Sequence, residues 1–312
     1  MKQISFFSKI YSKLFGINTL QELYLIGAGP GDPELITIKG QKALKTSAVI
    51  LYDNLANKKL LDIAPRSCEK IYVGKQPYGN YTPQETIHNL IKQYAFEKGK
   101  VVRLKGGDPF IFGRGFEEIL FARKHGISTH YIPGISSMQT SGLNDIPLTH
   151  RGVSESIWII TGTKKDGTLS ADLKQAIKSK ATVVIYMGMK KLAEIAETYI
   201  EAGYGSTPAA IIQHATLPTQ KQVICQARYL QHAADKKKLT YPAIIIIGDV
   251  IKAASLKEEE FDEHKINLKA NKLDSVIIQN GNIFMHLIFF FPGRGLHFCK
   301  RAAHHYFNFF TP

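Results

Sequence analysis

The sequence predicts an α/β protein made of two successive α/β halves. From residue 22 to residue 251, short apolar runs rich in Val and Ile alternate with longer segments of helical pattern. Such alternation is typical of mainly parallel sheets covered by helices. Two neighbouring runs in the second half, 209–213 and 221–227, are separated only by a short polar turn. We therefore expect a hairpin, and a mixed sheet, in the second half.

Each half is expected to hold five strands. In the first half these are LYLIG (23–27), AVILY (48–52), KIYVG (70–74), KVVRL (100–104) and THYIP (129–133), with helices at 34–46, 57–64, 83–98 and 114–125. In the second half they are SIWIITG (156–162), TVVIYMG (182–188), AAIIQ (209–213), KQVICQA (221–227) and AIIIIG (243–248), with helices at 169–178, 189–203 and 227–237.

The change from one half to the other falls near PLTHRGVS (147–154). We therefore expect an N-terminal extension (1–21), an N-terminal α/β domain (22–150), a C-terminal α/β domain (151–252) and a tail (253–312). The tail joins a charged stretch to an aromatic and histidine-rich end that has neither a helical nor a strand period. Disorder, docking on a partner and an atypical C-terminus are all open for it.

Composition limits the classes of function. The net charge of +14 is spread through the predicted domains, which indicates an acidic partner such as nucleic acid, phosphate or a polycarboxylate, or serves solubility alone. The three cysteines, Cys68, Cys225 and Cys299, lie far apart and predict neither a disulfide framework nor a metal site. A cytoplasmic protein fits this pattern. No run reaches the roughly 18 apolar residues of a membrane helix, and residues 1–20 lack the apolar run of a signal peptide.

The first glycine turn, in LYLIGAGPGDPELITIKG, partly matches the dinucleotide fingerprint G-x-G-x-x-G. Gly27 and Gly29 are in place, but Asp32 stands where the third glycine belongs and Pro30 removes a backbone N–H donor. The Asp32 carboxylate would lie where such a turn binds the pyrophosphate of a dinucleotide, and it would repel that diphosphate. The turn therefore favours a ligand without phosphates that lies close to the backbone. Asp32 also suits the N-cap of the following helix.

A second glycine turn follows the fourth strand in RLKGGDPFIFGRG (103–115). Gly106 and Gly107 allow a ligand to lie against bare backbone, and Asp108 adds a carboxylate at the same edge. Core packing is favoured over a pocket wall for the apolar residues that follow, Phe110, Ile111 and Phe112.

Further polar residues follow the second and fifth strands. Ser136 and Ser137 are expected to cap the next helix and to present hydroxyl groups. Asp53 stands where a Rossmann fold binds ribose, and proton chemistry is the other open role. Because open α/β sheets bind ligands at this edge, the carboxylates of Asp32, Asp53 and Asp108 favour a cationic, phosphate-free ligand such as S-adenosylmethionine.

Taken together, the motifs GAGPGDPELITIKG, VILYDNL, IYVGK, TPQETI, VVRLKGGDPFIFGRG, PGISS, IPLTHR, VVIYMGMKKL and PAIIIIGDV resemble the tetrapyrrole methylases, and among them the uroporphyrinogen-III C-methyltransferases. The resemblance runs unbroken from about residue 22 to residue 251. It implies an α/β fold of two α/β domains with a ligand cleft between them, in a homodimer. It also implies two methyl transfers from S-adenosyl-L-methionine to uroporphyrinogen III, at C2 and C7, giving precorrin-2 for sirohaem or cobalamin biosynthesis.

The resemblance also assigns roles to residues. Asp53 becomes the proton acceptor and Lys75 the proton donor, although binding of a substrate carboxylate is the alternative for Lys75. The cofactor contacts become Pro30, Gly106, Gly107, Asp108, Ile111, Ser136, Ser137, Met187 and Ala215. Ala215 replaces a family glycine, so a contact there depends on whether the turn needs a positive φ.

The eight carboxylates of this substrate give the basic excess a purpose. The candidate partners are Lys105, Arg114, His150 and Arg151. No metal ligand set is expected, nor a membrane or nucleic-acid partner. The alternatives are another precorrin or tetrapyrrole methylase of the same fold and, from a different class, a basic nucleic-acid-binding protein, for which the sequence offers no recognisable motif.

Overall fold

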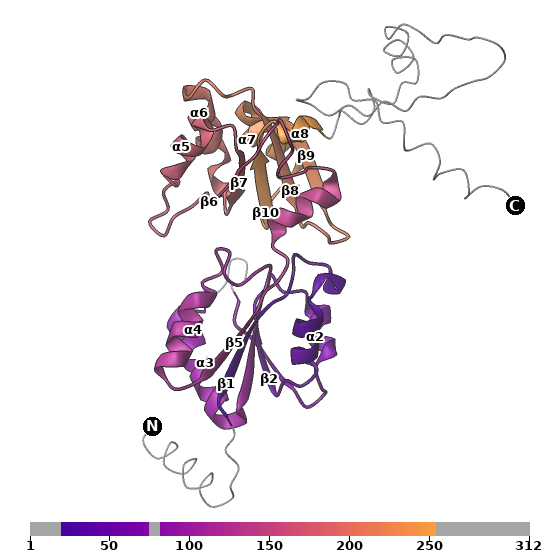
Figure 1. Ribbon diagram of the computed structural model, residues 1–312, viewed down its shortest axis with the longest axis vertical. Coiled ribbons are helices and arrows are strands. Elements are labelled where there is room, and N and C mark those ends of the chain that lie inside the picture. Colours follow the sequence, from indigo (N-terminus) through magenta and orange to yellow (C-terminus); the bar gives the residue numbers. More distant parts are fainter. Residues whose placement is uncertain (1–19, 75–81, 254–312) are drawn as a thin grey trace, which may run out of the picture. The chain divides into compact units, whose positions relative to one another are not determined.

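The computed structural model describes residues 20–74 and 82–253, which form two five-stranded sheets (Figure 1). The first sheet has the order β3-β2-β4-β1-β5, and every neighbouring pair is parallel. Its strands are β1 (Glu22–Gly27), β2 (Val49–Tyr52), β3 (Glu69–Tyr72), β4 (Lys100–Lys105) and β5 (Ser128–Ile132). Because all strands run the same way, the turns that follow them meet at one edge of the sheet.

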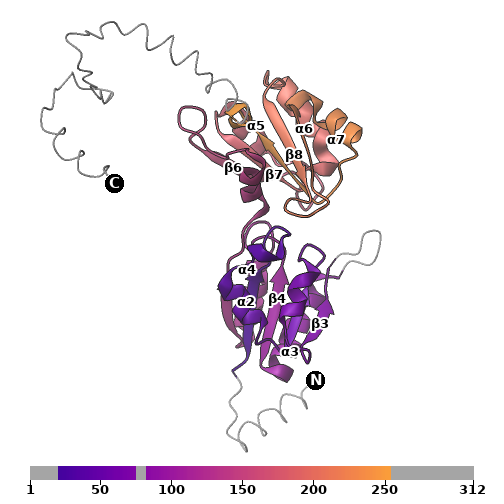
Figure 2. The ribbon, with the colours of Figure 1, turned by 90° about the vertical axis from the view of Figure 1, so that its right-hand side faces the viewer.

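Helices cover both faces of the first sheet (Figure 1; Figure 2). The helical elements are the 3₁₀ turns η1 (Pro33–Leu35) and η2 (Lys58–Ile63) and the helices α2 (Ile38–Leu44), α3 (Gln84–Lys98) and α4 (Gly115–Lys124). Side chains on the two faces of the strands belong to two separate hydrophobic cores. Leu23 and Leu51 pack with α3 and α4, whereas Ile26 and Ile50 pack with α2 and η2. A strand buried on both faces reads as a continuous apolar run, as the sequence shows.

The second sheet has the order β6-β7-β10-β8-β9. Its strands are β6 (Ile157–Thr161), β7 (Thr182–Tyr186), β8 (Pro208–Gln213), β9 (Lys221–Gln226) and β10 (Ala243–Ile247). Strands β6 and β7 are parallel, whereas β10 runs antiparallel to both β7 and β8, and β8 pairs antiparallel with β9. The expected hairpin and mixed sheet are confirmed.

One face of the second sheet packs against three helices, α5 (Asp172–Lys178), α6 (Leu192–Glu201) and α7 (Leu230–Lys237). The other face packs against Ile146 and Met138, which belong to the connection from the first sheet, and against α8 (Val250–Ala253). That connection includes the 3₁₀ segment η3 (Ser137–Asn144). The short 3₁₀ turns η4 (Met189–Lys191) and η5 (Ala227–Tyr229) precede α6 and α7.

The expected helix over 34–46 is wrong as a single element. A 3₁₀ turn ends at Leu35, Ile36 is extended, and α2 then starts afresh because the Thr37 hydroxyl accepts the N–H of Gly40 at 3.1 Å. The expected helix over 57–64 is a 3₁₀ turn capped by Asn57. Both differences come from short polar side chains that bond the local backbone. The exact domain boundaries, after residues 21, 150 and 252, stay predictions, and the tail lies outside the described residues.

Within residues 20–74 and 82–253, no helix is both long enough and apolar enough to cross a membrane.

Candidate active site

The backbone floor of the site is built where three loops touch through glycines. A side chain at Gly27 or at Gly134 would collide with the backbone of the other loop and with the Gly107 carbonyl. Gly29 and Gly107 form a two-way bridge, with N···O distances of 3.3 and 2.7 Å. Gly27 and Gly134 must therefore be glycine, because the main chains approach closer there than any Cβ allows.

Gly107 differs from its neighbours in having open space above it. Its φ is +65°, and a Cβ at this position would have only the Cα of Ser136 within 4 Å. Ser136 is the N-cap of η3, as expected, whereas Ser137 is not a cap but the first residue of η3. The Ser136 hydroxyl lies 2.7 Å from the phenol oxygen of Tyr186. The predicted contact Met187 directly follows Tyr186 and is 51% exposed.

The first glycine turn is anchored to the second half of the chain. The N–H of Asp32 donates to the Thr216 hydroxyl at 2.8 Å, and a side chain at Gly31 would meet the Ala215 carbonyl. Positive φ falls on His214 and Thr216 and not on Ala215. The alanine in place of the family glycine is therefore unstrained, and this turn still reaches the Pro30 loop.

Asp32 and Asp108 are both engaged in shaping their loops. The Asp32 carboxylate caps η1 by accepting the N–H of Glu34 at 2.9 Å, as expected. Asp108 is buried and accepts three hydrogen bonds, from the N–H of Phe110, the Tyr131 hydroxyl and the N–H of Gly134, at 2.7, 2.6 and 3.0 Å. Burial, with the hydrogen bond to Asp108, raises the pKa of Tyr131, which stays protonated as a donor. The electrostatic case for a cationic ligand is accordingly weaker than the sequence indicated.

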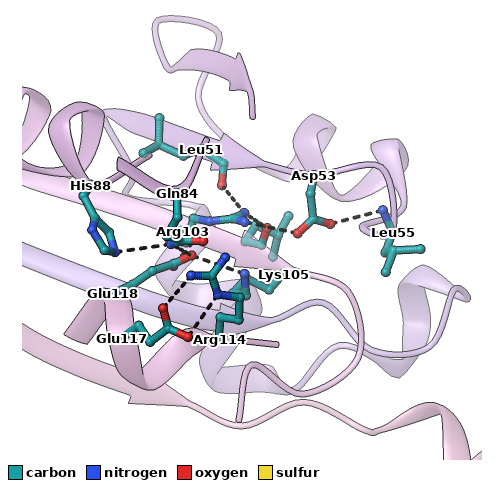
Figure 3. A network of polar contacts seen from close by, with 11 residues as sticks. Leu51, Asp53, Leu55, Gln84, His88, Arg103, Lys105, Arg114, Glu117 and Glu118 are labelled. Atoms are coloured by element: carbon teal, nitrogen blue, oxygen red, sulfur yellow. Dashed lines mark hydrogen bonds and ion pairs between the residues drawn. The ribbon is translucent and has the colours of Figure 1, made fainter. Parts of the chain in front are cut away.

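Asp53 directly follows β2 and belongs to a buried network of charges (Figure 3). One of its oxygens lies 3.2 Å from the Arg103 guanidinium, and the other accepts the N–H of Leu55 at 3.1 Å. The Arg103 side chain is 2% exposed and also donates to the carbonyls of Leu51 and Leu104. With 17% of its side chain exposed, Asp53 is the member of the ion-paired set that reaches solvent most.

Glu118, one of two glutamates in the first turn of α4, completes this network (Figure 3). It is fully buried, and its two oxygens lie 3.3 Å from the Lys105 ammonium and 3.4 Å from the Arg103 Nε. The second contact is an ion pair but too poorly aligned to be a hydrogen bond. Burial and the neighbouring Arg103 lower the pKa of Lys105. Because the Lys105 side chain is buried and its ammonium is paired with Glu118, its candidate role with substrate carboxylates is not supported.

A pocket of about 460 Å³ lies beside the backbone floor. It is lined by Pro109, Phe110, Phe112, Arg114, Gly115, Phe116, Glu117, Thr161, Thr163, Lys164, Lys165 and Met187, from both halves of the chain. Phe110 and Phe112 are 41% and 42% exposed, so core packing, favoured from the sequence, is wrong for both. Aromatic walls, with three cations and the Glu117 carboxylate in the lining, suit a ligand that has planar rings and carries carboxylates.

The predicted substrate contacts divide into two groups. Arg114 lines the pocket, and its guanidinium already binds Glu117 through two bonds of 3.0 and 2.6 Å. His150 and Arg151 are exposed in a separate turn and do not line the pocket. Lys75 lies outside the described residues. Sequence reasoning missed Thr163, Lys164 and Lys165, whose only signal was their position after a strand of the second sheet.

The remaining predicted contacts are placed as follows. Ile111 and Ser137 are both half-buried. Gly106 is packed too closely on Leu55 to carry a side chain. In the described part of the chain, no cluster of three or more His, Cys, Asp or Glu residues could hold a metal ion.

Comparison with known proteins decides the family. The sequence model described as Tetrapyrrole (Corrin/Porphyrin) Methylases matches residues 22–231. The chain belongs to the tetrapyrrole methylase family.

Relatives within the tetrapyrrole methylases are similar over most of the described chain. A Uroporphyrinogen-III C-methyltransferase from Bacillus subtilis is 43% identical over 234 residues, which are 74% of this chain and 91% of the relative. A Siroheme synthase from Thiobacillus denitrificans is 40% identical over 233 residues, and the chain spans about half of that protein (49%). The chain likewise spans about half the length of the other siroheme synthases that it matches first.

Solved structures of tetrapyrrole methylases share the fold. Uroporphyrin-III C-methyl transferase from Thermus thermophilus, complexed with S-adenyl homocysteine, is 37% identical and superposes with a TM-score of 0.65 over 74% of this chain and 99% of that one. Cobalt precorrin-4 methyltransferase is 26% identical, with a TM-score of 0.66 over 74% of this chain and 95% of that one. The two-domain fold expected from the resemblance is confirmed.

The residues of this tetrapyrrole methylase fit S-adenosylmethionine as a cofactor. The expected contacts Pro30, Gly107, Ser136, Met187 and Ala215 lie on five segments that direct contacts join into one assembly. Open space above Gly107 leaves room for a ligand against the backbone. Main chain, hydroxyls and a thioether match a nucleoside and an amino acid without phosphates.

Proposed function

We propose that this chain transfers methyl groups from S-adenosyl-L-methionine to C2 and C7 of uroporphyrinogen III, giving precorrin-2 for sirohaem or cobalamin biosynthesis. The observation that carries the proposal is the joining of five ligand-facing loop segments beside an aromatic pocket with a cationic rim. The name of the Bacillus subtilis relative, of which the chain covers 91%, supports the choice of substrate.

Bound S-adenosylmethionine would supply an electrophilic methyl group. The protein's task is to hold an electron-rich carbon of the reduced tetrapyrrole in line with that group, because such positioning can be worth an effective molarity of about 10⁵ M or more. Phe110, Phe112 and Phe116 provide flat apolar surface for the ring system and exclude water from the reacting carbon. Arg114, Lys164 and Lys165 are placed to bind its carboxylates.

A proton must leave the methylated carbon framework, and Asp53 is the proposed acceptor. Its carboxylate is held by Arg103 and by the N–H of Leu55 while part of it stays exposed. Lys75 is the proposed donor, with binding of a substrate carboxylate as its alternative. We also propose that the protein forms a homodimer and that it is cytoplasmic. The boundary between its two α/β domains is proposed to lie near residue 150.

Incubation of the purified full chain with uroporphyrinogen III and S-adenosylmethionine, without oxygen, tests the function. The absorbance of a dimethylated product is expected, and mass spectrometry should show two added methyl groups. Turnover of a different tetrapyrrole with none of uroporphyrinogen III would favour another methylase of this fold. Binding of RNA or DNA that weakens with salt, without binding of S-adenosylhomocysteine, would instead favour a nucleic-acid-binding protein.

A further inference from the structure

Tyr186, at the end of β7, bonds the loop that carries two of the expected cofactor contacts. Its phenol oxygen lies 2.7 Å from the Ser136 hydroxyl and accepts the N–H of Met138 at 3.1 Å. Ser136 is buried, and Tyr186 is half-buried. One hydroxyl group thus fixes the start of η3 from both sides of Ser137.

The ring of the same residue supports the wall of the pocket. It packs on the ring of Phe112, with the centroids 5.3 Å apart and the planes inclined by 48°. Phe112 lines the pocket and has a φ of +51°, an unusual conformation for a bulky residue that needs support from its surroundings. The packing against Tyr186 supplies part of that support.

The residue after Tyr186 is held as well. Met187 also has a positive φ, of +55°, and its carbonyl accepts the Thr163 hydroxyl at 2.8 Å. The backbone next to Tyr186 is therefore held in place, while the Tyr186 oxygen contacts the Ser136 loop and the Tyr186 ring contacts Phe112.

We propose that Tyr186 is a positioning residue with two separable functions: its hydroxyl sets the Ser136 loop for the cofactor, and its ring sets Phe112 for the substrate. This inference rests on the proposed function, because it concerns the same site. A purely structural role would lower stability and leave both ligand affinities unchanged.

Calorimetric titration of the full chain with S-adenosylhomocysteine tests the hydroxyl. Tyr186→Phe keeps the ring and removes the oxygen together with its two hydrogen bonds. We expect the Kd to rise roughly three- to tenfold, which corresponds to the net contribution of about one hydrogen bond. The KM for uroporphyrinogen III should change less than about twofold. Tyr204→Phe, the same change at an exposed tyrosine of the second half, should leave the Kd unchanged.

Two further variants make the test independent of stability. Phe112→Leu should raise the substrate KM and leave the Kd of S-adenosylhomocysteine unchanged, the reverse of Tyr186→Phe. Ser136→Ala should weaken cofactor binding, and its effect should not add to that of Tyr186→Phe, since the two hydroxyls bond each other.

An unchanged Kd in a folded Tyr186→Phe protein would overturn the inference while leaving the proposed function intact. Additive effects of Tyr186→Phe and Ser136→Ala would overturn it too. If the unaltered chain fails to bind S-adenosylhomocysteine, the proposed function falls, and the inference with it.

Discussion

Replacing Glu118 by Gln tests whether the buried charges under Asp53 form one interdependent network. The substitution keeps the shape of the side chain and removes its charge. Arg103 and Lys105, buried beside it, then share only Asp53 as a described counter-charge (Figure 3).

The size of the effect follows from the distances. At 3.3 and 3.4 Å, and at an effective dielectric constant of about 20, each ion pair of Glu118 is worth roughly 5 kcal/mol before desolvation is subtracted. Breaking a buried pair from one side typically costs about 3–5 kcal/mol net, because the remaining charge stays buried. We expect the free energy of unfolding at pH 7 to fall by about 3 kcal/mol or more.

The loss should depend on pH. The pKa of Lys105 is already lowered by burial, and Glu118 opposes this effect, so Glu118→Gln lowers it further. A lysine with a lowered pKa binds fewer protons in the folded than in the unfolded protein between its folded and unfolded pKa values. Stability therefore rises with pH through that window, and the variant should recover part of its loss between pH 7 and pH 10.

Urea unfolding of the full chain at several pH values measures both effects. The neighbouring substitution Glu117→Gln is the matched control, because Glu117 is half-exposed and pairs with Arg114 at the surface. It should change the unfolding free energy by no more than about 1 kcal/mol. Equal, small losses for both variants would refute the view of a buried, interdependent network.

Three further substitutions probe the site. Gly134→Ala should cost about 2–3 kcal/mol or more in thermal unfolding, since its methyl group overlaps two neighbouring backbones, whereas Gly142→Ala, with open space around it, should be nearly neutral. Asp32→Ala should cost about 1 kcal/mol through loss of the cap, measured by urea unfolding. Asp53→Asn should lower kcat by about 10²-fold or more and leave the calorimetric Kd of S-adenosylhomocysteine within twofold; an unchanged kcat would remove Asp53 from proton transfer.

The positions of the strands along the chain could be predicted from sequence because most are short runs of Val, Ile and Leu, and several end at a glycine. Their order within each sheet was not predicted. The hairpin of β8 and β9 followed from its short connection alone. The break before α2 was not predicted, because it depends on which of several polar residues bonds the backbone, and Thr37 did so. Helical periodicity carries no information about that competition.

The glycine loops of the candidate site could be predicted from sequence, but the partners of its charged side chains could not. The glycine turns could be recognised in the sequence, since only glycine allows two main chains to approach so closely. The sequence did not reveal that Asp108 is enclosed by Tyr131 and Gly134, or that Arg103 reaches back to Asp53, because both depend on contacts between distant segments. The exposure of Phe112 likewise depends on a backbone conformation that composition does not indicate.

The glycine contact of the three loops has a consequence for how such a protein can change its ligand. Where Gly27 meets Gly134, a Cβ on either residue would overlap the backbone of the other loop, so substitution cannot gradually reshape that contact. Variation is open to pocket-lining residues such as Phe112, Lys164 and Met187, which take no part in that glycine contact. A change of acceptor substrate therefore requires substitutions in the pocket lining, while the glycine contact between the loops stays the same.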